Sequence, residues 1–308
     1  MAVIVVAGPT GSGKSELALR LAETFPAEIV GCDSVQIYRQ FDIGSAKLPV
    51  HERRGIPHHL IDIRGAEEVF TAGDYARRAR QTLREIADRG QAAIVVGGTG
   101  FYLRALLDGL FPGPQRDAAL RERLSKRERM RPGSLHRLLR RWDPSSAARI
   151  HVNDVNKTMR ALEVTLLKRQ PMSEQLEQGR DALQGFRVCK IGLNPDRSEL
   201  YARLDRRVVG MFEGGLIDEV RDLLDNQGVS PHAKPFESLG YRQALAYIKG
   251  QMGGEEAIAS TQMETRRYAK RQMTWFRRDA EIRWFTGFGN DAVIQEDVAA
   301  YIGVQLSQ

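Results

Sequence analysis

The segment Val3-Ile-Val-Val-Ala7-Gly8-Pro-Thr-Gly-Ser-Gly13-Lys14-Ser15 decides the fold that we predict for this chain. Its first five residues are apolar and rich in β-branched side chains, which predicts a buried strand. Residues 15–24 have the apolar spacing of an amphipathic helix. Between this strand and this helix, the pattern GxxxxGK(S/T) is satisfied by Gly8, Pro9, Thr10, Gly11, Ser12, Gly13, Lys14 and Ser15. Because the motif lies in the strand–loop–helix context that it requires, we expect a phosphate-binding P-loop.

The P-loop predicts a site for a diphosphate or a triphosphate. Its glycines let backbone N–H groups surround phosphate oxygens, and the helix N-terminus adds its dipole. Lys14 supplies a positive charge, and the Ser15 hydroxyl is a ligand for Mg²⁺. A P-loop ATPase or GTPase usually has an aspartate after a second apolar strand, but here that strand ends in Gly97-Gly98-Thr99-Gly100. Asp33 and Asp62 remain available, so the loop could activate a γ-phosphate or hold a leaving pyrophosphate.

Short β-branched runs alternate with helical patterns along much of the chain, which is typical of an α/β fold. We predict strands at 3–7, 28–31, 59–63, 91–96, 187–193 and 282–285, and helices at 15–24, 74–89, 199–226, near Tyr241 and at 255–279. Between residues 113 and 186 the sequence predicts polar helices and no strand. The expected architecture is a P-loop NTPase-like parallel sheet flanked by helices, formed by residues 1–112 and 187–308, with an inserted all-helical domain of residues 113–186.

Composition indicates a soluble globular protein. The chain has 308 residues, of which 42% are hydrophobic and 28% charged, and its mean hydropathy is −0.39. No apolar run approaches the ~18 residues of a membrane span, so we expect no membrane association. Cys32 and Cys189 are too few for a disulfide framework or a zinc site, which favours a reducing compartment. Strand-like sequence follows Met1 directly, so we expect no export signal and a cytoplasmic location.

The positive charge of the chain is concentrated in one block. The net charge is +7, and residues 116–149 contain eleven basic and four acidic residues, so this block alone has the same excess of seven. An anionic partner such as RNA is one explanation. A solvated helical surface rich in Arg and Glu is the other, and charge alone does not decide between them.

Polar residues follow two of the predicted strands. In a parallel sheet the carboxyl ends of the strands meet at the ligand crevice, so Asp33-Ser34-Val35-Gln36 and Gly97-Gly98-Thr99-Gly100 should lie near the P-loop. Asp33 could act as a base or orient an amine, and the Thr99 hydroxyl could hydrogen-bond to the same group. Alternatively, Asp33 caps the following turn and the glycines only reverse the chain.

Several motifs together resemble the tRNA dimethylallyltransferase family, also called the IPP transferases, in its bacterial form. The resemblance rests on the P-loop and on ordered blocks at 32–38, 42–47, 57–62, 96–103, 153–163, 203–207, 240–243 and 265–276. It covers nearly the whole chain, and several blocks in order are far more specific than a P-loop alone. Within one block, Val155-Asn-Lys157 stands where the family commonly has Pro-Gln-Arg, and Lys157 cannot reproduce the bidentate geometry of an arginine.

The resemblance implies an activity. Enzymes of this family transfer a dimethylallyl group from its diphosphate to N6 of adenosine 37 of tRNAs that read codons beginning with U, and release pyrophosphate in the presence of Mg²⁺. Thr10 to Ser15 would hold the diphosphate. Asp33 would accept or orient the N6 proton, and Thr99 would position the donor or the amine. Arg207 would neutralise charge on the leaving group, with Arg203, one helical turn away, as the competing assignment.

The resemblance also implies a partner, the tRNA anticodon stem-loop, and a monomeric protein. The implied tRNA-binding residues are Asp33, Ser34, Val35, Gln36, Thr99, Arg121, Asn156, Lys157, Thr158, Met159, Arg160, Gly240, Tyr241 and Arg242. Three rival functions remain open. An adenylate isopentenyltransferase would act on free AMP or ATP, a small-molecule P-loop kinase would transfer phosphate, and a noncatalytic GTPase-like switch would bind RNA without forming a product.

The last long helix separates into two faces when residues are placed at 100° intervals. One face carries Arg266, Arg267, Lys270, Arg271, Arg277 and Arg278, and the other carries Tyr268, Ala269, Gln272, Met273, Trp275 and Phe276. The basic face predicts contact with phosphates or with solvent. We expect Tyr268 and Trp275 to be core residues, and we expect structural roles for His58, His59 and Cys32.

Overall fold

The computed structural model describes residues 1–111, 113–177 and 179–307. The described chain divides into two compact units, which we call the core unit (1–106 and 184–308) and the helical unit (107–183). The helical unit begins at residue 107, six residues before the predicted start at residue 113. It ends at residue 183, three residues before the predicted end at residue 186. The backbone N–H of Leu183 donates to the carbonyl of Leu107 at 2.8 Å, so the two connecting segments are joined before the helices begin. Residue 112, the predicted boundary, lies outside the described residues.

The core unit contains the predicted parallel sheet. Within the described residues its strands are β1 (Ala2–Ala7), β2 (Ala27–Gly31), β3 (His58–His59), β4 (Ala92–Val96), β5 (Arg187–Leu193) and β6 (Arg283–Phe285). They are parallel and lie in the order β3-β2-β4-β1-β5-β6, with Val3 opposite Ala93 and Ala2 opposite Arg187. Central strand β1 is buried on both faces, which explains its unbroken apolar sequence.

One predicted strand is much shorter than expected. The pattern at 59–63 predicts five extended residues, but β3 ends at His59. Leu60 and Asp62 have φ angles of 61° and 59°, which lie in the left-handed region and are incompatible with an extended strand. The chain therefore turns away from the sheet, and this turn brings Asp62 close to the segment that follows β2.

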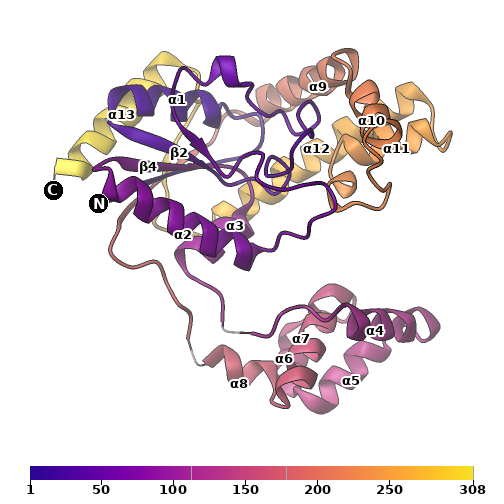
Figure 1. Ribbon diagram of the computed structural model, residues 1–308. Helices are drawn as coiled ribbons and strands as arrows, with labels where there is room; N and C mark the ends of the chain where they lie inside the picture. Colours follow the sequence, from indigo (N-terminus) through magenta and orange to yellow (C-terminus); the bar gives the residue numbers. More distant parts are fainter. Residues whose placement is uncertain (112, 178, 308) are drawn as a thin grey trace. The chain divides into compact units, whose positions relative to one another are not determined.

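Helices cover both faces of the sheet (Figure 1). Helices α1 (Lys14–Thr24) and α13 (Ala292–Ser307) lie on one face, and α2 (Ala72–Asp88) and α3 (Gly100–Leu107) lie on the other. The apolar core on the first side includes Leu17 and Leu21 of α1 and Val298 of α13, packed against strand residues. The sequence analysis did not predict α13. No described helix is long and apolar enough to cross a membrane.

The remaining helices of the core unit follow β5. They are α9 (Arg197–Glu213), α10 (Leu216–Asp225), α11 (Tyr241–Ile248) and α12 (Gly254–Phe276), with the 3₁₀ helices η1 (Val50–Glu52) and η2 (Lys234–Glu237) in connecting loops. The prediction of one helix over 199–226 is wrong. Gly215 has a φ of 98°, which ends α9 and starts α10 in a new direction.

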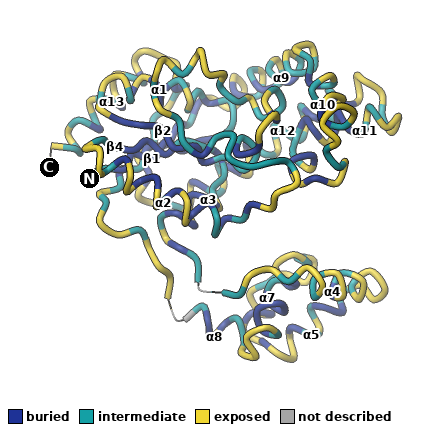
Figure 2. Tube along the Cα trace, in the orientation of Figure 1, coloured by how far each residue is buried: buried dark blue, intermediate teal, exposed yellow. Residues whose placement is uncertain are grey.

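The helical unit has its own small core. Its elements are α4 (Ala118–Met130), α5 (Ser134–Trp142), α6 (Pro144–Arg149), α7 (Val155–Lys168) and α8 (Met172–Glu177). Leu124, Leu135, Leu139 and Leu162 are buried together at its centre. Figure 2 shows buried residues on the inward faces of α5 and α7 and exposed residues on α4. Buried Asp143 accepts hydrogen bonds from Ser146 N and Ser173 N and so ties α6 to α8.

Candidate active site

The P-loop has the geometry that its sequence predicts. Gly11 and Gly13 have φ angles of 78° and 85°, and α1 begins directly after them. At Gly13 a Cβ atom would lie 2.8 Å from the backbone nitrogen of Gly289, whose N–H donates to Ser12 O at 2.8 Å. Glycine is therefore required at position 13 for two reasons, the left-handed backbone and the close approach of the chain before α13.

A cavity of about 320 Å³ opens beside the P-loop in the core unit. Parts of the chain far apart in sequence form its walls: the P-loop, the ends of β2 and β4, the loop at 45–48, α9 and α12. The lining residues on which the argument depends are Thr10, Lys14, Ser15, Asp33, Gln36, Ser45, Ala46, Arg203, Arg207, Tyr268 and Gln272. The cavity lies beyond the carboxyl ends of parallel strands, the usual ligand site in α/β sheets.

The P-loop end of this cavity favours an anion. Lys14 Nζ donates to Pro9 O at 2.7 Å. Burial, reinforced by the nearby positive charge of Arg207, lowers the pKa of Lys14 to about 7, and Asp33 opposes the shift. Burial also lowers the pKa of Arg207. Two desolvated cations without a bound anion destabilise each other, so a diphosphate here would relieve their repulsion.

The structure separates the two arginines that competed for the leaving-group role. Both belong to α9 and both line the cavity. Arg207 donates to Thr10 Oγ1 of the P-loop at 3.4 Å. Arg203 donates to Asn290 Oδ1 at 2.6 Å and stacks over the ring of Phe288. Arg207 is therefore the better placed to contact a diphosphate held by the P-loop.

Asp33 lies in the cavity wall and also caps a turn. Its Oδ1 accepts hydrogen bonds from Val35 N at 2.8 Å and Gln36 N at 3.3 Å. Both bonds end on one carboxylate oxygen, so the capping role and a substrate contact are compatible. Thr99 Oγ1 accepts from Ser34 N at 3.1 Å, which fixes the same turn. The structure thus brings Asp33, Ser34, Val35, Gln36 and Thr99 together, as the strand order predicts.

Two functional candidates escaped the sequence analysis. Buried Gln272 of α12 accepts from Thr10 N through Oε1 and donates from Nε2 to Gly98 O, both at 2.8 Å. Tyr268, one turn earlier, lines the cavity, and burial raises the pKa of its hydroxyl to about 12. Tyr268 is therefore only partly buried, whereas we expected a core residue. A polar Gln272 on the apolar face of its helix was the signal that this side chain has a buried hydrogen-bond partner, although not which partner.

The residues of the P-loop fit the predicted magnesium ion. Ser15 lines the cavity, and within the described structure the buried hydroxyl of Ser12 has no hydrogen-bond partner. Among described residues, no group of three or more His, Cys, Asp or Glu side chains forms a metal site. Mg²⁺ commonly binds through one or two protein ligands, water and substrate phosphates. A single hydroxyl beside a phosphate site fits that mode.

Two of the three residues in the predicted tRNA-binding block at 240–242 are buried. Gly240 and Tyr241 are buried, and only Arg242 is exposed. The Tyr241 ring packs against Phe41, with ring centres 5.0 Å apart, and its hydroxyl donates to Glu219 Oε1. The Tyr241 side chain is therefore a core contact, and the predicted tRNA-binding role of this block stays a prediction.

In the helical unit, several predicted tRNA-binding residues are held in the interior. Thr158 and Met159 are buried, and their predicted tRNA-binding role stays a prediction. Arg121 and Arg160 pair with the fully buried Glu163, at 2.9 Å and 2.6 Å. Glu163 accepts from both guanidinium groups, so these arginines stabilise the unit whether or not they touch RNA. The remaining members of the segment, Asn156 and Lys157, are exposed, and Lys157 pairs with Asp154.

Other cations of the helical unit face solvent. The exposed basic residues of the block at 116–149 are Arg116, Arg123, Lys126, Arg127, Arg129, Arg131, Arg137, Arg140, Arg141 and Arg149. The localised positive charge of the sequence is therefore a surface property of this unit. On α12 of the core unit the basic face is partly neutralised, since Arg266 pairs with Asp205 and Arg267 with Glu264.

The remaining candidates have structural contacts. Burial raises the pKa of the Cys32 thiol to about 12, so it is protonated at neutral pH and unsuited to act as a nucleophile. His59 Nε2 contacts Oε2 of buried Glu28 at 2.6 Å, and Arg89 donates to both oxygens of the same carboxylate. His58 Nδ1 contacts Ile56 O at 2.8 Å.

Known proteins resemble the chain over its whole length. A family model described as IPP transferase matches residues 36–279. A protein of Solibacter usitatus named tRNA dimethylallyltransferase is 60% identical over 98% of this chain and 100% of its own length. Its namesake in Koribacter versatilis is 55% identical over 95% of each chain.

Solved structures agree with this likeness. The tRNA isopentenylpyrophosphate transferase of Bacillus halodurans superposes with a TM-score of 0.74 at 34% identity, over 99% of this chain and 97% of that one. A eukaryotic dimethylallyltransferase acting on tRNA gives a TM-score of 0.79 at 28% identity, over 98% of this chain and 77% of that one. The predicted α/β fold with flanking helices is confirmed.

Proposed function

The chain belongs to the IPP transferase family and is a prenyl-transferring enzyme, and we propose the following reaction for it. It transfers a dimethylallyl group from dimethylallyl diphosphate to N6 of adenosine 37 in tRNAs that read codons beginning with U. The products are N6-isopentenyladenosine and pyrophosphate. One observation carries this proposal: a single cavity is lined by Lys14 of the P-loop, by Arg207 and by the carboxylate of Asp33.

The P-loop end serves the leaving group. An adenine amino group is a poor nucleophile, so the catalyst must favour cleavage of the allylic C–O bond by stabilising the pyrophosphate that departs. Lys14 and the backbone N–H groups from Thr10 to Ser15 would bind its oxygens. Arg207, already in contact with Thr10, would neutralise the charge that develops. Mg²⁺, held by the Ser15 hydroxyl and diphosphate oxygens, would add positive charge at the same place.

Asp33, in the wall of the same cavity, would act on the amine. The N6 nitrogen forms a bond to the allylic carbon as the C–O bond breaks, and it must then lose a proton. Asp33 would orient the amino group and accept that proton, with Thr99 holding the turn that carries the carboxylate. Gln272 connects the P-loop with the loop after β4, because its side chain forms a hydrogen bond with each of them.

The exposed cations of the helical unit support a tRNA anticodon stem-loop as the partner, since phosphate neutralisation supplies most nonspecific RNA affinity. The proposed location is the cytoplasm, where tRNA is modified, and the proposed oligomeric state is a monomer.

An adenylate isopentenyltransferase that uses AMP or ATP would have little use for this basic surface. The relatives from Solibacter usitatus and Koribacter versatilis are named tRNA dimethylallyltransferase. These names support tRNA as the substrate, and they support neither the adenylate enzyme nor a small-molecule kinase.

A product assay tests the proposal. The protein is incubated with dimethylallyl diphosphate and Mg²⁺ together with either an anticodon stem-loop containing A36-A37 or AMP, and nucleosides are analysed by mass spectrometry. We expect prenylated adenosine from the stem-loop and none from an otherwise identical RNA with guanosine at position 37. Product from AMP with none from RNA would overturn the assignment in favour of the adenylate enzyme.

A further inference from the structure

We propose that Glu219 and Tyr241 are positioning residues, which fix one wall of the cavity through the loop of residues 42–47. Neither side chain lines the cavity. Their effect on catalysis would pass through the loop, called here the wall loop, whose members Ser45 and Ala46 do line it. This inference rests on the proposed function, because the wall loop matters here as part of the site where the amine meets the donor.

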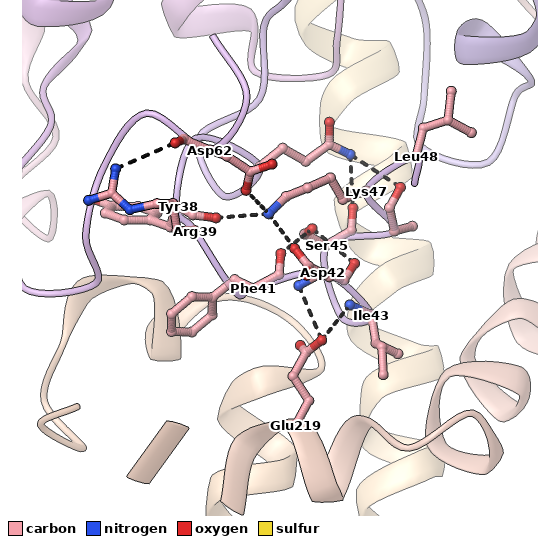
Figure 3. A network of polar contacts seen from close by, with 12 residues as sticks. Tyr38, Arg39, Phe41, Asp42, Ile43, Ser45, Lys47, Leu48, Asp62 and Glu219 are labelled. Carbon is pink, nitrogen blue, oxygen red and sulfur yellow. Dashed lines mark hydrogen bonds and ion pairs between the residues drawn. The ribbon is translucent and has the colours of Figure 1, made fainter. Parts of the chain in front are cut away.

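Glu219 of α10 binds the start of the wall loop (Figure 3). Its Oε2 accepts from the backbone N–H of Ile43 at 2.8 Å and of Asp42 at 3.2 Å. Its Oε1 accepts from the hydroxyl of Tyr241. One carboxylate therefore satisfies two loop amides and one phenol. Burial raises the pKa of Glu219, with the Asp42 carboxylate adding to the shift.

Lys47 closes the other end of the wall loop. Its side chain is only 4% exposed, and Nζ contacts the carboxylates of Asp42 and Asp62 and the carbonyl of Tyr38. Figure 3 shows the ammonium group lying between these oxygens. The turn that shortens β3 delivers Asp62 to this position. The Asp42–Lys47 ion pair joins the first and last residues of the loop, so the segment between them is held at both ends.

The wall loop is also tied to the turn that carries Asp33. Gln36 Nε2 donates to Ser45 O at 3.0 Å and to Ala46 O at 3.3 Å. The backbone N–H of the same Gln36 donates to Asp33 Oδ1. A continuous chain of hydrogen-bonded segments thus runs from Glu219 through the loop and Gln36 to the proposed base. Displacement of the loop would change the orientation of that carboxylate.

A close approach shows how little freedom the loop has. A Cβ atom at Gly44 would lie 2.6 Å from Cε2 of the Tyr241 ring. Ala46 has a φ of 49°, a left-handed conformation that is uncommon for alanine and needs support from its surroundings. The ring of Tyr241 limits the loop on one side, and the carboxylate of Glu219 holds its amides. These contacts explain why the partly buried Glu219 pairs with the buried Tyr241 next to this segment.

Four substitutions separate positioning from general stability. Tyr241→Phe removes one hydroxyl and keeps the ring, and Glu219→Ala removes the acceptor of the loop amides. Glu219→Gln keeps an amide oxygen for the two N–H groups and an NH₂ group that can donate to Tyr241. Asp218→Ala is the matched control, because Asp218 is the neighbouring residue on α10, has a side chain that is 79% exposed and pairs with Arg221 of the same helix.

We expect kcat for prenylation of the stem-loop to fall about tenfold in Tyr241→Phe and Glu219→Ala, the scale of a small misplacement in an active site. The KM for dimethylallyl diphosphate should stay within about twofold, because the P-loop is untouched. Glu219→Gln should recover most of the loss, and Asp218→Ala should match the wild type. Hydrogen exchange at the amides of Asp42 and Ile43 should accelerate in the two impaired variants.

The outcomes are distinguishable. A wild-type protein that forms no prenylated RNA overturns the proposed function and this inference with it. An active wild type, with unchanged kcat in Tyr241→Phe and Glu219→Ala, overturns the positioning role alone. If Glu219→Ala does not fold, Tyr241→Phe and Gly44→Ala decide, since the latter displaces the loop without touching Glu219. An equal loss in Glu219→Gln and Glu219→Ala, with normal exchange in the loop, would also contradict the inference.

Discussion

Thr10 and Gln272 are joined by a hydrogen bond of 2.8 Å although 262 residues separate them in the chain. The same glutamine donates to Gly98 O, so one side chain of α12 connects the P-loop with the loop after β4. This contact places the proposed diphosphate site and the loop that anchors the Asp33 turn in one fixed arrangement. A buried amide that satisfies two backbone groups at once is difficult to replace.

Replacement of Gln272 should therefore affect both stability and activity. Gln272→Ala leaves the N–H of Thr10 and the carbonyl of Gly98 without this partner, and we expect a loss of about 1–3 kcal/mol in unfolding free energy. We also expect a higher KM for dimethylallyl diphosphate, because the P-loop loses its support. Urea unfolding and steady-state kinetics measure the two effects. Thr274→Ala, an exposed change on the same helix, is the control; equal behaviour of the two variants would refute the role.

Asp33 should be required for chemistry more than for RNA binding. Asp33→Asn keeps Oδ1 as the acceptor for Val35 N and Gln36 N but removes the base. We expect turnover to fall by about 10²–10⁴-fold, the scale of a positioned acid or base. Affinity for the stem-loop, measured by fluorescence anisotropy, should be nearly unchanged. Unaltered turnover in this variant would remove Asp33 from the mechanism.

Pyrophosphate binding should depend on pH through Lys14. In the free protein the pKa of Lys14 is lowered to about 7, and a bound anion favours the charged form and raises that pKa. Above pH 7 the free site must first take up a proton, so affinity should fall as pH rises, by up to about tenfold per unit. Calorimetry in two buffers of different ionisation enthalpy should detect uptake of up to one proton near pH 8. Lys14→Arg should bind without this uptake, and identical uptake in both proteins would contradict the assignment.

Two classes of arginine in the helical unit should behave differently. Arg123 and Arg127 are exposed, so replacing both with Gln should weaken RNA binding and reduce the slope of log K against log salt by about one to two. Arg121 pairs with buried Glu163, so Arg121→Gln should lower stability by about 1–3 kcal/mol. Anisotropy titrations over a salt series and denaturant unfolding test the two expectations. An unchanged slope in the double variant would exclude this surface as the RNA contact.

Local patterns sufficed for much of the fold and for one end of the site. The P-loop, the central strands and the helical character of the inserted segment each depend on residues that are neighbours in sequence. The parallel strand order then places Asp33 and Thr99 beside the P-loop. Family resemblance selected the reaction, which neither charge nor the P-loop could name.

Other features depend on contacts between distant segments. Gln272 contacts Thr10 only because α12 packs beside the P-loop. The residues near Gln272 in the sequence do not indicate this partner. Tyr241 belongs to a motif associated with RNA, yet Phe41 and Glu219 bury it in the core unit. Arg121 contributes to the positive charge of its block, but its guanidinium faces Glu163, 42 residues away. Burial and pairing decide which charges are available, and sequence alone does not show them.

The central claim is that the P-loop binds a pyrophosphate leaving group, with transfer of the prenyl group to RNA. Its most direct test is the stoichiometry of one reaction, in which released pyrophosphate and prenylated adenosine are quantified from the same mixture of protein, dimethylallyl diphosphate, Mg²⁺ and stem-loop. We expect about one pyrophosphate per prenylated adenosine, with no ATP or GTP required. Inorganic phosphate released from ATP or GTP, without prenylated RNA, would contradict it.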